Sequence, residues 1–413
     1  MSESYAPAPI LLEGPNFSGR TAHLRGFVGL PPVSGGELTQ GLSGGAFVAQ
    51  DSQNFISGLA TTGHLELLLH GLEQCPFRED IERLTVQLRL RECLDRNPFT
   101  LSGGEQAMLT VLSAAAMTPR RLALDGVLEQ LSDASREVML DLIGGPLATV
   151  CATRLADNRL THFPGLLERF SLRPPGAVPA LRPDTPWPGR TTGKVLTLAG
   201  IRFAYRRGQA VLDGIDFRLQ PGRVYVLHGA NGAGKSTLSK VLCGILRPRS
   251  GELLTATGQR VQPWREPAGL FAYHFQNPDL QLFHTRVRDE LGLVGEPSDG
   301  GTFHLVHGFG LESVLDEHPL DLPYVLRKRV AMAATLAMFR PWTILDEPTL
   351  GQDDANCLAL AAFLRRAAKA GAGIIVISHS RWFSAQLDAE HILLRGGRLE
   401  AVVPTEISAE KRV

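Results

Sequence analysis

The sequence predicts an α/β fold that is built twice along the 413 residues of the chain. Three observations carry this prediction. A glycine-rich loop at 229–236 stands between a strand-like apolar run and a helix-like pattern, a weaker copy of this arrangement occurs near the N-terminus, and a proline-rich stretch separates the two. A chain of this length is expected to hold two or three domains, each with its own core.

The loop at 229–236 has the spacing of a phosphate-binding P-loop. It follows the apolar run 224–227, and its sequence is Gly-Ala-Asn-Gly-Ala-Gly-Lys-Ser. A strand before such a loop and a helix after it are the context that the motif requires. Glycines let successive N–H groups turn toward phosphate oxygens, and the helix start adds a favourable dipole. We therefore expect Lys235 to reach the terminal phosphates and Ser236 to ligate Mg²⁺.

The N-terminal half carries a diverged copy of this pattern. Residues 14–21 keep the P-loop spacing, but Arg20 stands where lysine is expected and the bulky Phe17 replaces a small residue. Further on, the motif Leu-Ser-Gly-Gly-Glu at 101–105 lies 221 positions before 322–326, and Asp125 lies the same distance before Asp346. Gln50 and Gln276 each follow an apolar run. A constant offset predicts two copies of one domain.

The boundary between the copies is predicted at residues 173–193. Between Pro174 and Pro188 the chain has six prolines and no apolar periodicity, which favours an extended linker over the alternative of an irregular subdomain edge. The predicted domains are 1–172 and 194–413. About thirty residues with strand character precede the second P-loop and only thirteen precede the first, so the N-terminal copy is expected to lack most of a small β-subdomain.

Composition narrows the classes of partner. Lysine plus arginine equals aspartate plus glutamate, so bulk charge does not indicate a nucleic-acid partner. The five cysteines are scattered without a C-x-x-C pair, a pattern typical of a reducing cytosol. The sequence has neither a pattern typical of a signal peptide nor a window of about 20 apolar residues, so a membrane role is expected to come through a partner.

Together these motifs resemble the ATP-binding-cassette (ABC) ATPases, over nearly the whole chain and twice. The resemblance rests on the P-loop, the glutamine loop, the Leu-Ser-Gly-Gly-Glu signature, a strand ending in Asp-Glu and a late histidine after a strand. It implies a RecA-like parallel sheet core with a helical signature subdomain in each half. Residues 275–283 and 318–330 are further similar to the ATPase subunits of energy-coupling-factor (ECF) importers.

In this family two cassettes face head to tail, and each ATP lies between the P-loop of one and the signature of the other. The resemblance therefore implies one complete composite site, with the P-loop of the C-terminal half and the signature of the N-terminal half. Glu347 would orient the attacking water, with Gln276, Lys235 and His379 as further catalytic residues, and Mg²⁺ would be held by Ser236, Gln276 and Asp346. The implied ATP contacts are Tyr205, Gly229, Asn231, Gly232, Gly234, Lys235, Ser236, Thr237, Ser102, Gly103 and Gly104.

The other composite site is expected to be degenerate. Its P-loop and strand-end positions are Gly14, Gly19, Arg20, Thr21, Gln50 and Asp125. Gly126 stands where the general base belongs, and Thr153-Arg154 stands where the other half has Ser378-His379. The opposing signature, 322–326, has neither serine nor glycine, and its Pro323 lacks an N–H. Glu129 is disfavoured as a substitute base, because a shift of three residues moves a carboxylate by several ångströms.

Since the defects fall together in one site, the expected assembly is an intramolecular pseudo-dimer of the two halves. The expected function is the ATP-hydrolysing subunit of an ECF-type importer for a micronutrient, peripheral on the cytoplasmic face of the membrane. Its partners would be integral-membrane transporter subunits, a coupling protein and a substrate-binding protein, with residues 277–290 either forming part of the docking groove or an ordinary surface helix. The alternatives are a conventional ABC transporter ATPase and a soluble tandem ABC protein acting on ribosomes or nucleic acid.

Overall fold

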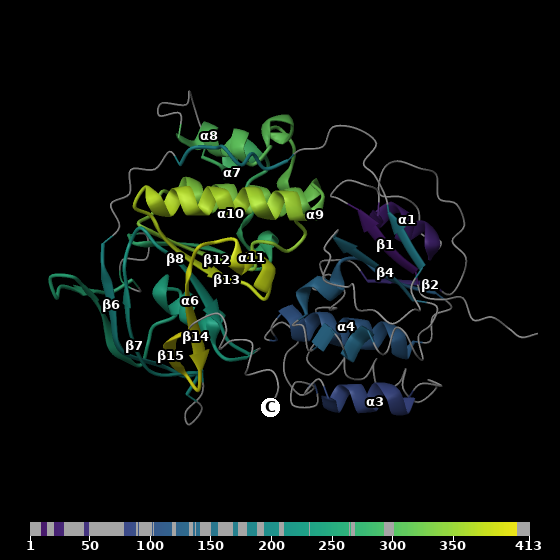
Figure 1. Cartoon of the computed structure of the whole chain (residues 1–413), viewed down its shortest axis with the longest axis horizontal. Coiled ribbons are helices and arrows are strands. Elements are labelled where there is room, and N and C mark those ends of the chain that lie inside the picture. The colour runs from purple at the N-terminus through teal and green to yellow at the C-terminus, as the bar shows by residue number, and fades with distance from the viewer. Residues whose placement is uncertain are drawn as a thin grey trace, which may run out of the picture. The chain divides into compact units, whose positions relative to one another are not determined.

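The computed structural model divides the chain into two compact units, residues 1–178 and most of residues 179–413 (Figure 1). The structure describes residues 10–14, 20–28, 45–48, 78–87, 90, 101, 103–117, 121–131, 135–136, 138–140, 150–155, 168–171, 180–187, 194–205, 210–230, 232–263, 265, 269–292 and 301–402. None of the helices in these ranges combines the length and the apolar character needed to cross a membrane.

The first unit is built on a parallel sheet with the strand order β2-β3-β4-β1-β5. Its strands are β1 (Ile10–Gly14), β2 (Gly45–Val48), β3 (Arg121–Leu124), β4 (Val150–Leu155) and β5 (Glu168–Ser171). Its helices are α1 (Arg20–Phe27), α3 (Arg78–Gln87) and α4 (Gly103–Ala116), with a short 3-10 turn, η4 (Val127–Gln130). The apolar side of α4 is buried against β2, β3 and η4, which forms the core of this unit.

The second unit contains a larger sheet with the strand order β11-β12-β13-β8-β14-β15. Its strands are β8 (Val224–His228), β11 (Phe271–His274), β12 (Trp342–Asp346), β13 (Gly373–Ile377), β14 (Glu390–Arg395) and β15 (Arg398–Val402). The first five are parallel, and β15 returns as an antiparallel hairpin. All residues of β12 and β13 are buried, which explains why these strands are continuous apolar runs.

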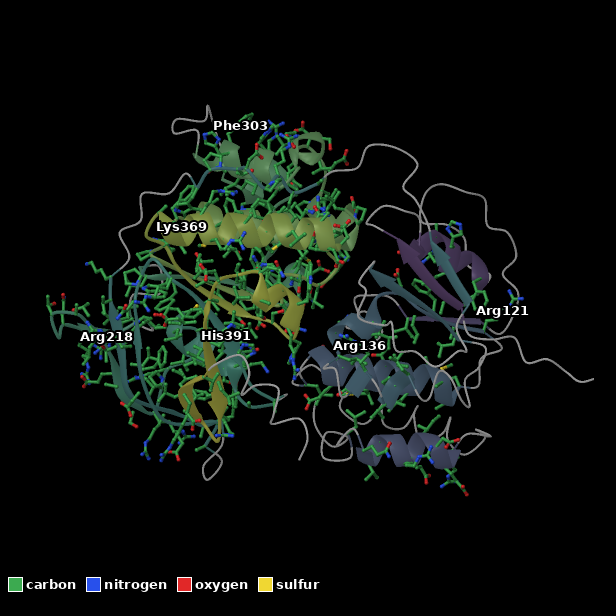
Figure 2. All side chains as sticks on the ribbon, in the orientation of Figure 1. Arg121, Arg136, Arg218, Phe303, Lys369 and His391 are labelled. Carbon is green, nitrogen blue, oxygen red and sulfur yellow. The ribbon has the colours of Figure 1, made fainter. Side chains whose placement is uncertain are left out.

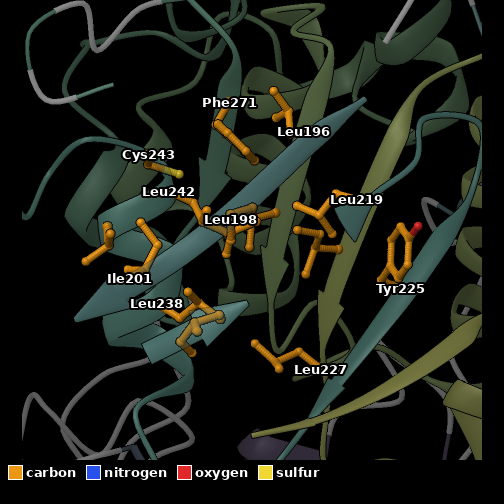
Figure 3. Close-up of a cluster of buried hydrophobic side chains, with 14 of the residues drawn as sticks. Leu196, Leu198, Ile201, Leu219, Tyr225, Leu227, Leu238, Leu242, Cys243 and Phe271 are labelled. Carbon is orange, nitrogen blue, oxygen red and sulfur yellow. The ribbon is translucent and has the colours of Figure 1, made fainter. Parts of the chain in front are cut away.

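A separate antiparallel sheet, with the order β10-β9-β6-β7, lies beside the parallel one in the second unit and contacts it through β7 and β15. Its strands are β6 (Leu196–Phe203), β7 (Leu212–Leu219), β9 (Ser250–Thr255) and β10 (Arg260–Val261). Leu198 and Leu219 pack with Leu227 of β8 and Leu238 in a shared apolar cluster (Figure 3). The described residues of the first unit contain no antiparallel sheet, and the loss of this subdomain stays a prediction.

The helices of the second unit surround the parallel sheet. They are α6 (Lys235–Leu242), α7 (Val287–Glu290), α8 (Gly301–Gly308), α9 (Tyr324–Ala337), α10 (Asp354–Lys369) and α11 (Arg381–Ala385), with the 3-10 turns η6 (Pro278–Gln281), η7 (Glu312–Val314) and η8 (Pro319–Asp321). Helix α9 packs on β11, β12, η6, α7 and α8, so it joins the helical part of the unit to the sheet edge. The predicted α/β fold with a parallel sheet core is confirmed.

The two parallel sheets have matching topology. In chain order β1, β2, β3, β4 and β5 occupy the positions that β8, β11, β12, β13 and β14 occupy in the second sheet. Strands β3 and β12 begin 221 positions apart, and the 14-residue helices α4 and α9 begin at the same offset. The offset found in the sequence thus relates equivalent elements of two similarly wound sheets.

The proline-rich stretch differs from the extended linker that the sequence predicts. Residues 180–187 pack on the second unit, where the Leu181 N–H donates to Asn356 Oδ1 over 2.8 Å. The Trp187 ring makes edge contacts with Phe339 and Phe363, at centroid distances of 5.9 and 5.8 Å. Prolines suppress apolar periodicity, yet isolated large side chains between them still bury surface. The remaining residues of the predicted linker, 173–179 and 188–193, lie outside the described ranges.

Candidate nucleotide site

The candidate P-loop joins β8 to α6 in the second unit, as the sequence predicts. Gly229 and Gly234 have φ angles of 152° and 102°. A Cβ on Gly229 would lie 2.7 Å from the Leu394 carbonyl oxygen, and one on Gly234 would lie 2.8 Å from Val211 Cγ1. Both positions therefore require glycine for space as well as for backbone conformation. Asn231, which the resemblance places among the ATP contacts, lies outside the described residues.

Lys235 and Ser236 begin α6 and turn toward different partners. The Lys235 ammonium donates to the carbonyl oxygens of Gly229 and Ala230, at 2.8 and 3.1 Å. Burial lowers the pKa of Lys235, and the carboxylates of Glu347 and Asp346 oppose that shift. The Ser236 hydroxyl donates to Asp346 Oδ2 over 3.0 Å, so the loop and the end of β12 meet at one carboxylate.

Tyr273 of β11 is a site residue that the motif search misses. Its hydroxyl donates to the same Asp346 Oδ2, at 2.8 Å. Burial, followed by the neighbouring Asp346 carboxylate, raises the pKa of Tyr273 well above its usual value, so the phenol remains a donor at neutral pH. In the sequence this tyrosine is one aromatic residue in an apolar strand, and its partner is 73 positions away.

Glu347 follows the end of β12 and is buried beside Asp346. Its Oε1 accepts a hydrogen bond from the backbone N–H of His379, at 2.9 Å, and lies 3.7 Å from His379 Nε2. Burial and the Asp346 carboxylate raise the pKa of Glu347 to about 8, against the opposing effects of Lys235, Lys328 and the His379 N–H. The predicted catalytic pair of Glu347 and His379 is therefore in contact, and its carboxyl group has the strong pKa perturbation typical of functional sites.

The backbone at Glu347 is strained. Its φ angle is 46°, in the left-handed region that side chains other than glycine rarely adopt. The equivalent position in the first unit is Gly126, whose φ angle is 64°. The turn after the strand thus keeps the same conformation in both units, and only the second unit carries a side chain there. Strain of this kind is characteristic of positions held in place for function.

Gln276 and Tyr205 complete the described part of this site. Gln276 lies two residues beyond β11, and its backbone oxygen accepts a hydrogen bond from Lys328 Nζ over 2.6 Å. Burial lowers the pKa of Lys328 to about 7, opposed by the Asp346 and Glu347 carboxylates. The side chain of Tyr205 is 61% exposed and its hydroxyl lies 3.2 Å from Thr237 Oγ1, which leaves a ring face accessible next to the start of α6.

A stacked histidine pair lies directly before the P-loop. His391 lies on β14 (Figure 2). His228 ends β8, with 2.7 Å between its Nε2 and His391 Nδ1 and 5.0 Å between the ring centroids. Burial first, and then His391, Lys235 and Arg381, lower the pKa of His228 to about 4. Burial also lowers the pKa of His391. Both rings are therefore neutral in the folded protein at neutral pH.

This pair is expected to make the fold sensitive to acid. Because the pKa of His228 is lower in the folded chain than in the unfolded chain, its contribution to stability is complete above about pH 6.5 and is lost as the pH falls toward 4. The full shift is worth about 3 kcal/mol, and partial exposure of the ring reduces the expected loss to about 1–2 kcal/mol. For His228→Gln, the melting temperatures at pH 7.5 and 5.0 should lie closer together than they do for the parent chain. The exposed control His304→Gln should show the same difference between the two pH values as the parent.

The first unit retains part of the same geometry. The Thr21 hydroxyl at the start of α1 donates to Asp125 Oδ2, as Ser236 does to Asp346. Gly14 ends β1 and Arg20 begins α1. The expected equivalence of Thr153-Arg154 with Ser378-His379 is wrong by one residue, because β1 pairs Leu12 with Thr153 whereas β8 pairs Leu227 with Ile377, so Arg154-Leu155 are the counterparts. The expected ATP contacts Gly103 and Gly104 form the first turn of α4. Ser102, Gly19 and Gln50 lie outside the described residues.

The signature position of the second unit has a different helix start. Helix α9 begins after Pro323, which makes no side-chain capping hydrogen bond. Tyr324 and Val325 occupy the positions equivalent to Gly103 and Gly104. A proline without an N–H and two residues with bulky side chains leave less backbone accessible to an anion than the glycines of α4 do.

Comparison with known proteins agrees with this geometry. A family model described as ABC transporter matches residues 212–350. A putative ABC transporter ATP-binding protein of Treponema denticola is 27% identical over 386 residues, covering 84% of this chain and 78% of that protein. The energy-coupling factor transporter ATP-binding protein EcfA of Methanocaldococcus jannaschii is 33% identical over 223 residues, covering 50% of this chain and 78% of that protein.

Among solved structures, cbiO1 from Clostridium perfringens, described as part of the ABC transporter complex cbiONQ, is 29% identical. The match covers 53% of this chain and 92% of that one, with a TM-score of 0.44. From the family match and from its identity to EcfA over most of that protein's length, the chain belongs to the ATP-binding proteins of ABC transporters, which are ATPases.

Proposed function

We propose that the chain is the ATP-hydrolysing subunit of an ECF-type importer for a micronutrient and that it has one active and one degenerate composite site. The observation that carries the proposal is the sorting of site residues between the two units. Glu347, Lys235 and His379 belong to the second unit, whereas the first unit has Gly126 and Arg20 at the first two positions and, by strand register, Leu155 at the third. The signature glycines occur only in the first unit, so one combination of the halves has every element and the other combination has few.

The active combination pairs the P-loop of the second unit with the signature at 101–105. In this proposal Lys235 and the loop N–H groups hold the terminal phosphates, while Ser102, Gly103 and Gly104 contact the γ-phosphate from the opposite side. Glu347 orients the attacking water, with Gln276 and His379 close to it. Hydrolysis of a phosphoanhydride depends on such positioning and on charge neutralisation more than on covalent chemistry.

The residues fit the proposed Mg²⁺. The Ser236 hydroxyl and the Asp346 carboxylate are oxygen donors in contact with each other, and such donors are preferred by this cation. Gln276 is the third proposed ligand. Bound Mg²⁺ would neutralise charge on the phosphates, and Tyr273 would keep the Asp346 carboxylate oriented through its hydrogen bond.

The proposed partners are two integral-membrane subunits, and the docking region proposed for them is 277–290. Leu280 and Phe283 in this region have 58% and 81% of their surface exposed, and Leu320 of η8 has 45%. Both turns contact α9, and large apolar side chains that gather at an exposed surface are typical of protein interaction sites. The similarity to EcfA favours an ECF-type partner over other ABC transporter membrane subunits.

Purification of the tagged full chain from detergent-solubilised membranes tests this proposal. A stoichiometric pair of small multi-span proteins is expected, and the substrate-binding member would indicate the solute class. Leu280→Asp with Phe283→Asp should abolish the association, and Ile245→Asp, which alters an exposed apolar side chain outside the docking region, should not. Recovery of a single conventional permease would exclude the ECF type, and recovery of ribosomal proteins or nucleic acid alone would overturn the transport role.

A further inference from the structure

Lys328 lies in the stretch 318–330 that is similar to ECF ATPase subunits, and it is a buried charge with no role among the site residues named above. It lies in the second turn of α9 and has no exposed surface. Its ammonium donates to the Gln276 carbonyl oxygen at 2.6 Å, with longer contacts to the carbonyl oxygens of Phe275 at 3.4 Å and Asp346 at 3.5 Å. An ammonium has three donors, so one side chain links the glutamine loop to the end of β12.

The surroundings of Lys328 are acidic on the side of the nucleotide site. The carboxylates of Asp346 and Glu347 both attract the ammonium. Lys235 also faces these carboxylates, but in the proposed reaction its ammonium contacts the phosphates. Lys328 therefore remains beside the end of β12 when Lys235 contacts the phosphates, and the two carboxylates favour its ammonium form.

The first unit lacks both members of this arrangement. The position 221 residues before Lys328 is Ala107, a fully buried residue of α4. The position 221 residues before Glu347 is Gly126. One unit thus has a buried lysine and a buried glutamate, and the other has alanine and glycine at the same places. Arg329 likewise corresponds to Met108, so the buried cations of α9 are specific to the second unit.

We propose that Lys328 is a positioning residue for ATP hydrolysis, holding the Gln276 and Asp346 backbones together and providing the counter-charge that keeps Glu347 in its hydrolytic position. This inference rests on the proposed role of Glu347 and extends it to a residue that is not among the site residues expected from the motifs. The N-terminal part of α9 would then have a function that does not depend on the altered signature at 322–326.

The neighbouring contacts explain how α9 performs this task. Arg327 forms an ion pair of 2.7 Å with Asp279 of η6, and the Gln281 amide donates to Ala331 O and Thr335 Oγ1. Gln281 Oε1 in turn accepts from the Phe275 N–H at 2.8 Å. The segment 275–281 is therefore fastened to one face of α9, and Lys328 extends that attachment to Asp346.

A double-mutant cycle on thermal stability tests the charge pairing without reference to activity. Lys328→Met should lower Tm by about 5 °C or more in the parent chain, because it leaves buried carboxylates unpaired. In a Glu347→Gly background, which reproduces Gly126, the same change should lower Tm by less than about half as much. Equal losses in both backgrounds would overturn the pairing of Lys328 with Glu347.

Steady-state kinetics of the full chain in its membrane complex tests the positioning. Lys328→Met is expected to reduce kcat for ATP about 10–100-fold with KM within about threefold, and Lys328→Arg should recover part of kcat. Lys240→Met on α6 is the control lysine and should behave like the parent. A loss of kcat that only follows the unfolded fraction would contradict the inference. If Glu347→Gln itself retains activity, the proposed catalytic role fails, whereas the stability cycle still reports on the charge pair.

Discussion

Replacing Glu347 by glutamine is expected to reduce kcat for ATP hydrolysis by at least about 100-fold, the range typical of losing a general base. The amide keeps the size of the side chain and can still accept the hydrogen bond from the His379 N–H, which is 2.9 Å long in the parent. It cannot take a proton from water. ATP affinity should therefore stay within about threefold of the parent, since only an interaction of the transition state is lost.

Single-turnover hydrolysis and equilibrium binding of a fluorescent ATP analogue separate these two effects. Glu252→Gln, on the separate antiparallel sheet, is the matched control and should hydrolyse ATP at the parental rate. Retention of more than about a tenth of the parental kcat by Glu347→Gln would show that another group orients the water. A parallel loss of ATP binding would instead indicate that the carboxyl group supports the loop itself.

The strand positions could be predicted from the sequence because the signals are local. The apolar run at 224–227 before the P-loop indicates a strand, and the structure places β8 there. The offset of 221 positions also predicted that α4 and α9 would be equivalent, and both helices begin at that offset. The turns of the loop at Gly229 and Gly234 could be predicted, because the backbone conformations that such turns require are almost specific to glycine.

The contacts that complete the site could not be predicted, because they depend on packing between distant segments. Tyr273 and Lys328 are unremarkable in the sequence, one in an apolar strand and the other in a basic run. Only the pairing of β11 with β12 brings the Tyr273 hydroxyl to Asp346, and only the packing of α9 on that edge brings Lys328 to the same strand end. The strained φ of Glu347 is likewise a property of the turn rather than of the residue.

For the proline-rich segment, a local sequence signal led to a wrong prediction. Its composition indicated an extended connection, yet Leu181 and Trp187 pack on the second unit. Composition reports how a segment behaves when it is free, whereas two well-placed apolar side chains suffice to attach it. The length that remains to connect the proposed pseudo-dimer is therefore shorter than the whole proline-rich stretch.

Replacing Lys235 by methionine is expected to reduce kcat/KM for ATP by at least about 100-fold, whereas Arg20→Met should change it by less than about twofold. The two residues occupy the same position of their P-loops, at the starts of α6 and α1. Lys235 shares its site with Asp346 and Glu347, so losing its ammonium removes phosphate neutralisation where hydrolysis is proposed to occur. In the first unit, Gly126 stands after β3 in place of a carboxyl group. Losing the Arg20 side chain therefore removes nothing from the proposed reaction.

The pair of variants measures the asymmetry directly, since each substitution exchanges one cation for methionine at equivalent places. Rates measured well below the melting temperature of each variant, with the folded fraction checked by circular dichroism, exclude unfolding as the cause of a rate change. Equal loss of kcat/KM from both would require that the N-terminal P-loop also contributes to turnover, and the one-site proposal would fall. Loss of kcat/KM from Lys235→Met alone would fit a first unit that contributes its signature to hydrolysis while its own P-loop no longer takes part. The presence of Gly126 at the position of Glu347 in the same turn leads us to expect this result.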